Sequence, residues 1–140
     1  MIEVRVEDKI AKPAANVWKL IGGFNDLTNW APGVNKSELE GQGVGAVRTL
    51  TLAQGGTIKE KLEAHDPAGM SYSYTIVSGP LPVSNYHSTL RVIADGAAAC
   101  KVEWSSRFEP AGSFPAEKVT KIIDSMYRGG IAAMKTKLGG

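Results

Sequence analysis

The chain has 140 residues and a formal net charge of +2, with 43% hydrophobic and 21% charged residues. This length suits one domain with a real core, and we expect residues 1–140 to form a single domain. The small charge and the scattered basic residues argue against nucleic acid as a partner. One cysteine and two distant histidines predict neither a disulfide nor a metal site, and we expect no cofactor.

No stretch approaches the ~20 apolar residues of a membrane-spanning helix, so no membrane insertion is expected. An alternating pattern begins at residue 2, so no signal peptide is predicted. The cytoplasm is the expected location.

The first third of the sequence predicts a strand followed by two short helices. Apolar and charged residues alternate over 2–7, as in a half-buried strand. Pro13 can open a helix that Gly22-Gly23 ends. A second short helix, ended by Pro32, holds Leu27 and Trp30.

Six further strands are predicted before one long helix. The strands fall at about 34–40, 46–52, 57–66, 70–77, 85–92 and 101–108. Apolar residues then recur at spacings of three and four from about Pro115 to Leu138, which predicts an amphipathic helix. An antiparallel sheet needs a cover on one face, and only this helix is large enough. We therefore expect an α+β fold.

The face of the sheet predicted to point inward carries many polar atoms. A solid core favours Leu, Ile and Val, so this set indicates a cavity with polar groups on its wall. The alternative is that the Tyr and Trp side chains sit at an open end with their polar atoms in water. The set comprises Arg48, Glu60, Tyr72, Tyr74, Tyr86, Ser88, Trp104 and Ser106.

Glu60 lies on the apolar side of the stretch T-I-K-E-K-L-E-A, where an unpaired carboxylate is costly. It can pair with Arg48 or a tyrosine hydroxyl and serve only the fold. It can also line the cavity and meet a ligand directly or through water, and we favour this second interpretation. Arg48 is expected to be a counter-charge or to reach solvent by its long stem. Trp18 and Trp30 are expected to be core anchors.

The whole chain resembles the START-like helix-grip superfamily (SRPBCC), which includes polyketide cyclases, lipid-transfer domains, birch-pollen-allergen-type proteins and plant abscisic-acid receptors. The element order carries the resemblance, together with four stretches: V-W-K-L-I-G-G-F-N-D-L-T-N-W-A-P, G-V-G-A-V-R-T-L-T-L, T-I-K-E-K-L-E-A-H-D and L-P-V-S-N-Y-H-S-T-L-R-V. It implies a curved seven-stranded antiparallel sheet wrapped around the C-terminal helix, with a ligand cavity between them.

The abscisic-acid receptors supply the most detailed resemblance. Their pocket lysine matches Lys36, their pocket aliphatics match Leu50 and Leu52, their glutamate matches Glu60, and their N-Y-x-S tyrosine matches Tyr86. The resemblance thus makes Lys36 an inward cation. The receptors' gate loop S-G-L-P-A and latch H-R-L are absent, so a hormone-triggered phosphatase partner is not implied.

The expected function is binding of a small, mostly apolar ligand: a lipid, polyketide, aromatic or hormone-like molecule bearing a carboxylate or carbonyl. One alternative is a polyketide cyclase or dehydratase that uses Glu60, Tyr86 or Lys36 as acid or base. Another is an interaction domain whose own side chains fill the cavity. No residue is assigned as catalytic, and a homodimer is a candidate assembly. The expected ligand-binding residues are Lys36, Leu50, Leu52, Glu60, Leu62, Tyr72, Tyr74, Tyr86, Ser88, Trp104, Ile123 and Tyr127.

Overall fold

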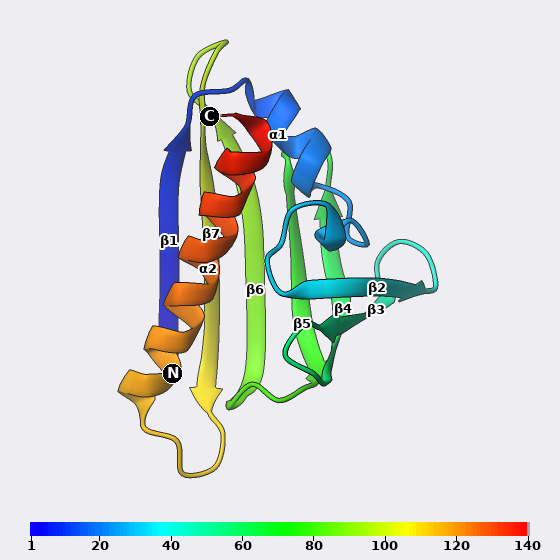
Figure 1. Ribbon diagram of the computed structural model, residues 1–140, viewed down its shortest axis with the longest axis vertical. Helices are drawn as coiled ribbons and strands as arrows, with labels where there is room; N and C mark the ends of the chain where they lie inside the picture. The colour runs from blue at the N-terminus through cyan, green and yellow to red at the C-terminus, as the bar shows by residue number, and fades with distance from the viewer. Residues whose placement is uncertain (140) are drawn as a thin grey trace.

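The computed structural model describes residues 1–139 and places seven antiparallel strands against one long helix (Figure 1). The sheet order is β1-β7-β6-β5-β4-β3-β2, so the first strand of the chain pairs with the last. The predicted α+β helix-grip fold is confirmed. The strands are β1 (Ile2–Ile10), β2 (Val34–Glu40), β3 (Val47–Leu52), β4 (Thr57–Asp66), β5 (Ser71–Ser78), β6 (Val83–Ala94) and β7 (Cys100–Pro110).

The first and last helices begin and end where the sequence signals predict, whereas the second short helix is shorter than predicted and does not include Trp30. Helix α1 (Ala14–Ile21) follows Pro13 and ends at Gly22. The second short helix is a single 3-10 turn, η1 (Leu27–Asn29). Helix α2 (Ala116–Leu138) follows Pro115, and Gly139 closes it in a left-handed conformation that glycine adopts readily. No helix among residues 1–139 is long and apolar enough to cross a membrane.

The sheet is strongly curved. In Figure 1 strands β2 and β3 run across the molecule, whereas β1 and β7 run along its length beside α2. The register of β4 against β5 shifts between Lys59 and Glu60 and again between Leu62 and Ala64. Such irregularities bend a strand and increase its twist, which is consistent with the curvature of the sheet.

The inward face of the sheet holds the residues that the alternation predicts. All eight polar-atom-bearing residues of the predicted inward set are buried, from Arg48 on β3 to Ser106 on β7. The core is completed from α2 by Val119, Ile123, Tyr127, Ile131 and Met134. The polar atoms therefore lie between the sheet and the helix, rather than at a wet open end.

Candidate functional site

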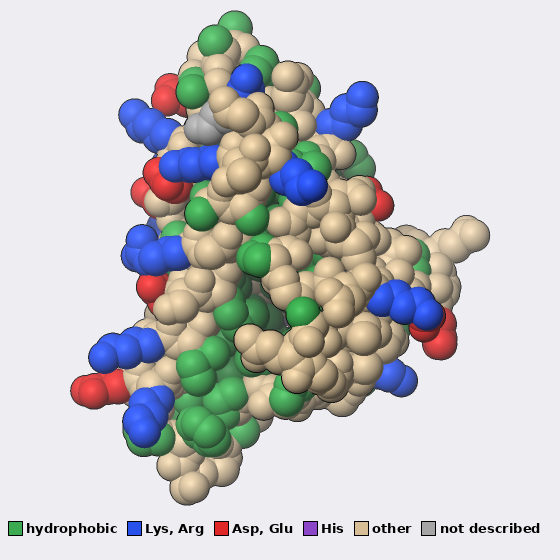
Figure 2. Space-filling model, viewed as in Figure 1, with side chains coloured by type: hydrophobic (Ala, Val, Ile, Leu, Met, Phe, Trp, Pro, Cys, Tyr) green, Lys and Arg blue, Asp and Glu red, His purple; other side chains and the backbone are tan. Residues whose placement is uncertain are grey.

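A cavity of about 400 Å³ opens between the curved sheet and α2. Its inner wall comes from β3, β4, β5 and β7, and one face of α2 closes it. The segment before β2 and the β3–β4 turn border its mouth, and the Ala53 N–H donates to the Gly33 carbonyl at 2.8 Å, joining the two. Figure 2 shows hydrophobic side chains gathered around a hollow beside α2.

The structure brings five of the predicted site residues to the cavity and buries six others in the core around it. Those at the cavity are Leu50, Leu52, Glu60, Tyr74 and Trp104. Those buried without lining it are Leu62, Tyr72, Tyr86, Ser88, Ile123 and Tyr127. The twelfth residue, Lys36, lies elsewhere.

The expectation that Lys36 points inward is wrong. Its side chain is 65% exposed, and its Nζ pairs with Glu38 Oε1 at 2.7 Å. The register of β2 slips between Val34 and Lys36, so Lys36 stands opposite Thr51 while Ser37 stands opposite the inward Leu50. A one-residue slip moves every later side chain to the other face, so the match to the receptors' pocket lysine does not make Lys36 an inward residue here.

One face of α2 that contacts the cavity was missed from the sequence. Ile122, Met126 and Gly129 line it at helical spacing, whereas the predicted Ile123 and Tyr127 lie one position farther around the helix and face the core. The apolar period identified the helix correctly. It could not separate the stripe facing the core from the stripe facing the cavity, because both are apolar.

Trp30 is a core residue that also lines the cavity, so its interpretation as a core anchor alone is incomplete. Its ring lies 5.8 Å from the Trp104 ring in an edge-to-face arrangement. Trp104 in turn stacks on Tyr127 with 4.4 Å between ring centroids. Two indoles therefore share the wall of the cavity.

A buried ion pair forms part of the wall. The Nε and Nη2 groups of Arg48 lie 2.8 and 2.7 Å from the same oxygen, Glu60 Oε1, and Nη1 donates to the Phe24 carbonyl at 2.5 Å. The guanidinium also lies 4.0 Å from the Phe24 ring centroid, where a cation is favoured. Glu60 thus pairs with Arg48 and also lines the cavity.

The Arg48 guanidinium stays charged in this setting. Burial acts to lower the pKa of Arg48, but the charge of Glu60, with smaller contributions from Tyr72 and Tyr74, outweighs it and raises the pKa. With 1% of its side chain exposed, Arg48 does not reach solvent by its stem, and its role as a counter-charge is confirmed.

A chain of hydroxyl groups leads from the cavity wall into the core. Trp104 Nε1 donates to Tyr74 Oη at 3.2 Å and to Ser88 Oγ at 3.1 Å. Ser88 Oγ lies 3.1 Å from Tyr127 Oη, which is hydrogen-bonded to Tyr86 Oη. Burial raises the pKa of Tyr127 to about 12 and those of Tyr74 and Tyr86 well above their usual value. These phenols are therefore neutral near pH 7.

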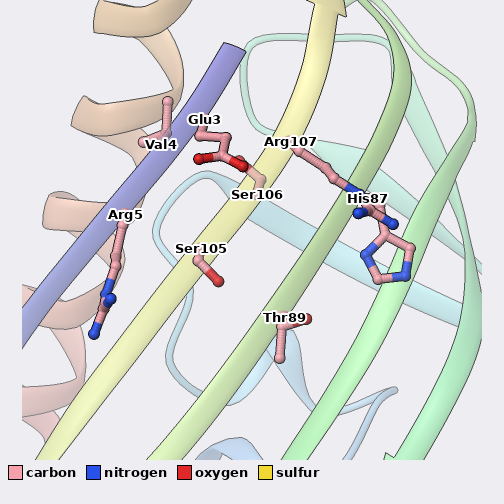
Figure 3. A pocket seen from close by; sticks show the side chains of 8 residues that line it. All are labelled: Glu3, Val4, Arg5, His87, Thr89, Ser105, Ser106 and Arg107. Atoms are coloured by element: carbon pink, nitrogen blue, oxygen red, sulfur yellow. The ribbon is translucent and has the colours of Figure 1, made fainter. Parts of the chain in front are cut away.

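A second hollow of about 380 Å³ lies on the outer face of the sheet (Figure 3). Its exposed charged side chains come from Glu3 and Arg5 on β1 and Arg107 on β7, and His87 on β6 also lines it. It is more open than the inner cavity and lacks its apolar enclosure. The inner cavity is therefore the stronger candidate for a ligand site.

The comparisons with known proteins agree with this architecture. A family model described as "Polyketide cyclase / dehydrase and lipid transport" matches residues 1–139. No curated protein matches the chain. A protein of Bacillus thuringiensis described as putative and uncharacterized has a similar structure, with a TM-score of 0.91 and 33% identity over 96% of this chain and 97% of that one.

Two further solved structures are informative. Protein XoxI from Bacillus cereus has a TM-score of 0.91 and 34% identity, covering 97% of this chain and 94% of that one. The di-domain ARO/CYC BexL from the BE-7585A biosynthetic pathway has a TM-score of 0.85 and 19% identity, covering 99% of this chain and 47% of that one. This last likeness shows a shared fold alone.

Proposed function

The chain belongs to the polyketide cyclase/dehydrase and lipid transport family, and we propose that it binds a small, mostly apolar ligand in the cavity between the sheet and α2. The observation that carries the proposal is the cavity itself. Its volume of about 400 Å³ lies within the range of roughly 300–1,000 Å³ usual for ligand pockets, and most of its lining is apolar. A lipid, a polyketide or an aromatic compound fits this description.

The apolar body of the ligand contacts Leu50, Leu52 and Ile58 on the sheet and Met126 on α2. Trp30 and Trp104 enclose it from the side. Glu60 and Tyr74 supply polar atoms on the same wall, and such groups fix a ligand's orientation while apolar contact supplies most of the affinity. A domain whose own side chains filled the cavity would not need polar atoms placed on an apolar wall.

Tryptophan emission tests this placement, because two of the three tryptophans line the cavity and Trp18 does not. Adding the neutral apolar probe N-phenyl-1-naphthylamine should quench emission of the wild type. The quench should persist in Trp18→Phe and disappear in Trp30→Phe/Trp104→Phe. Quenching that survives the double replacement would place the ligand elsewhere.

Native mass spectrometry of freshly purified protein should also detect a copurified small molecule.

A second candidate function is cyclisation or dehydration of a polyketide in the same cavity. It is favoured by the carboxylate of Glu60 and the phenol of Tyr74 on one wall, since such chemistry needs a positioned base and acid. Formation of an aromatic product from a poly-β-ketone thioester, lost in Glu60→Gln, would support the enzyme. Recovery of the unchanged ketone from the bound state would support the binding protein.

A further inference from the structure

The charges on the cavity wall are already matched. Among the described residues that line the cavity, the charged ones are Arg48 and Glu60. Three nitrogens of Arg48 are engaged, two by Glu60 Oε1 and one by the Phe24 carbonyl. The wall therefore offers an anionic ligand no unpaired cation, and Lys36 cannot supply one because it is exposed and paired with Glu38.

The same ion pair leaves one acceptor unused. Both contacts from Arg48 reach Oε1, so Glu60 Oε2 has no protein donor within residues 1–139. Among residues 1–139, the buried side-chain polar atoms without a partner are Trp30 Nε1 and Ser106 Oγ, so Glu60 Oε2 is not sealed off and stays accessible. Glu60 Oε2 is thus suited to accept a hydrogen bond from a hydroxyl or N–H group of a ligand.

Tyr74 leaves one donor unused beside it. Its hydroxyl oxygen accepts from Trp104 Nε1, and its own hydrogen has no protein acceptor in the described part of the chain. Leu62 stands opposite Tyr74 in the register, so Glu60 on β4 and Tyr74 on β5 are diagonal neighbours on one face. Diagonal side chains of that length reach the same small volume.

We infer that the ligand is electrically neutral and carries a hydrogen-bond donor, which Glu60 Oε2 accepts, beside an oxygen that accepts the hydroxyl hydrogen of Tyr74. This inference rests on the proposed function, because it specifies the polar end of the ligand bound there. A hydroxylated ketone, ester or amide meets both requirements. A fatty acid does not, because its carboxylate would lie against that of Glu60 with Arg48 already neutralised.

Three naphthalenes of one skeleton test the polar end by isothermal titration calorimetry at pH 7. The probe 2-naphthol is neutral and can donate and accept, 2-methoxynaphthalene can only accept, and 2-naphthoate is an anion. We expect 2-naphthol to bind about 3- to 10-fold tighter than 2-methoxynaphthalene, the range for one hydrogen bond. We expect it to bind at least about 10-fold tighter than 2-naphthoate, since that anion finds no free cation.

Two variants test the contributions of Glu60 and Tyr74 one at a time. Glu60→Gln removes the charge that neutralises Arg48, so 2-naphthoate should bind about 10-fold tighter than to the wild type, a gain that misfolding cannot produce. Tyr74→Phe should weaken 2-naphthol and 2-methoxynaphthalene about 3- to 10-fold. The Tyr74→Phe variant should fold, because Trp104 Nε1 keeps Ser88 Oγ as its hydrogen-bond acceptor. The matched control is Tyr86→Phe, whose hydroxyl pairs with Tyr127 and does not line the cavity.

The outcomes distinguish the two proposals. Failure of all three probes to bind the wild type would overturn the proposed function, and this inference with it. Binding of 2-naphthoate as tightly as 2-naphthol would overturn the inference and leave the binding function standing. Equal losses in Tyr74→Phe and Tyr86→Phe would remove Tyr74 from the polar contact.

Discussion

Arg48 and Glu60 are the residues whose burial most needs an explanation. Two ions taken out of water stabilise a fold only when their geometry is good and their remaining polar atoms are paired. Here the guanidinium binds Glu60, the Phe24 carbonyl and the Phe24 ring. The carboxylate keeps one oxygen at the cavity. A pair that served only the fold would be expected to use both carboxylate oxygens, so this geometry favours a role in binding as well.

Breaking this pair should be far more costly than removing it whole. Arg48→Met leaves Glu60 without its counter-charge and should lower the free energy of unfolding by roughly 3–5 kcal/mol. Arg48→Met/Glu60→Leu removes both charges and should recover most of that loss. Urea unfolding of both variants measures the difference.

Lys36→Met is the matched control, because it breaks an exposed pair with Glu38. An exposed ion pair contributes little to stability because water screens it, so this variant should unfold close to the wild type. A loss for Arg48→Met no larger than that for Lys36→Met would mean that the buried pair does not hold β3 and β4 together.

Helix α2 carries two adjacent glycines where it passes the cavity. A Cβ on Gly130 would lie 2.7 Å from Trp104 Cζ3 and 3.4 Å from Trp30 Cζ3, so the absence of a side chain there lets both indoles reach the helix. A Cβ on Gly129 would meet nothing within 4 Å. Packing therefore requires a glycine at Gly130, whereas nothing in the packing explains the glycine at Gly129.

Alanine at these two positions should act in opposite directions. Gly129→Ala should raise the free energy of unfolding by roughly 0.5–1 kcal/mol, because alanine loses less backbone entropy in a helix. Gly130→Ala should lower it by roughly 1–3 kcal/mol through overpacking against Trp104. Urea unfolding curves of the two variants, each the other's control, check the prediction. Destabilisation by both would indicate that Gly129 is also packed against a neighbour.

The elements could be predicted from the sequence wherever one physical pattern decided them. Alternation identified the strands, and spacings of three and four identified α2, because burial on one face imposes each period. Lys36 was misplaced because its inward position was taken from the resemblance to the receptors, and the slip in β2 turns it to the other face here. The faces of Ile122 and Ile123 could not be separated, because a cavity and a core both select apolar side chains.

At the scale of the whole molecule, the four tyrosines of the chain, three on the sheet and one on α2, are all buried. Burial raises the pKa of each, to about 12 for Tyr127. The unfolded chain ionises its tyrosines near pH 10. Above that pH the unfolded state has lost protons that the folded state still holds, so the free energy of unfolding falls as pH rises.

This difference predicts a cooperative alkaline transition. The contribution of the neutral tyrosines is complete below about pH 10 and is lost as pH rises through the folded-state pKa values. For Tyr127 alone, a shift from 10 to about 12 corresponds to roughly 3 kcal/mol. Absorbance at 295 nm reports tyrosinate and far-ultraviolet circular dichroism reports the fold. Both should change together, above pH 10, in one transition.

The same chain titrated in concentrated urea is the control, and its tyrosinate signal should rise near pH 10 as for free tyrosine. If tyrosinate instead formed near pH 10 in the native protein while the circular dichroism stayed constant, the hydroxyls would be open to solvent through the cavity. Tyr74 is the tyrosine closest to that path, because it lines the cavity whereas Tyr86 and Tyr127 bond to each other in the core. A neutral ligand that fills the cavity of the folded state should move the single alkaline transition to higher pH, which links the alkaline stability of the whole fold to occupancy of its site.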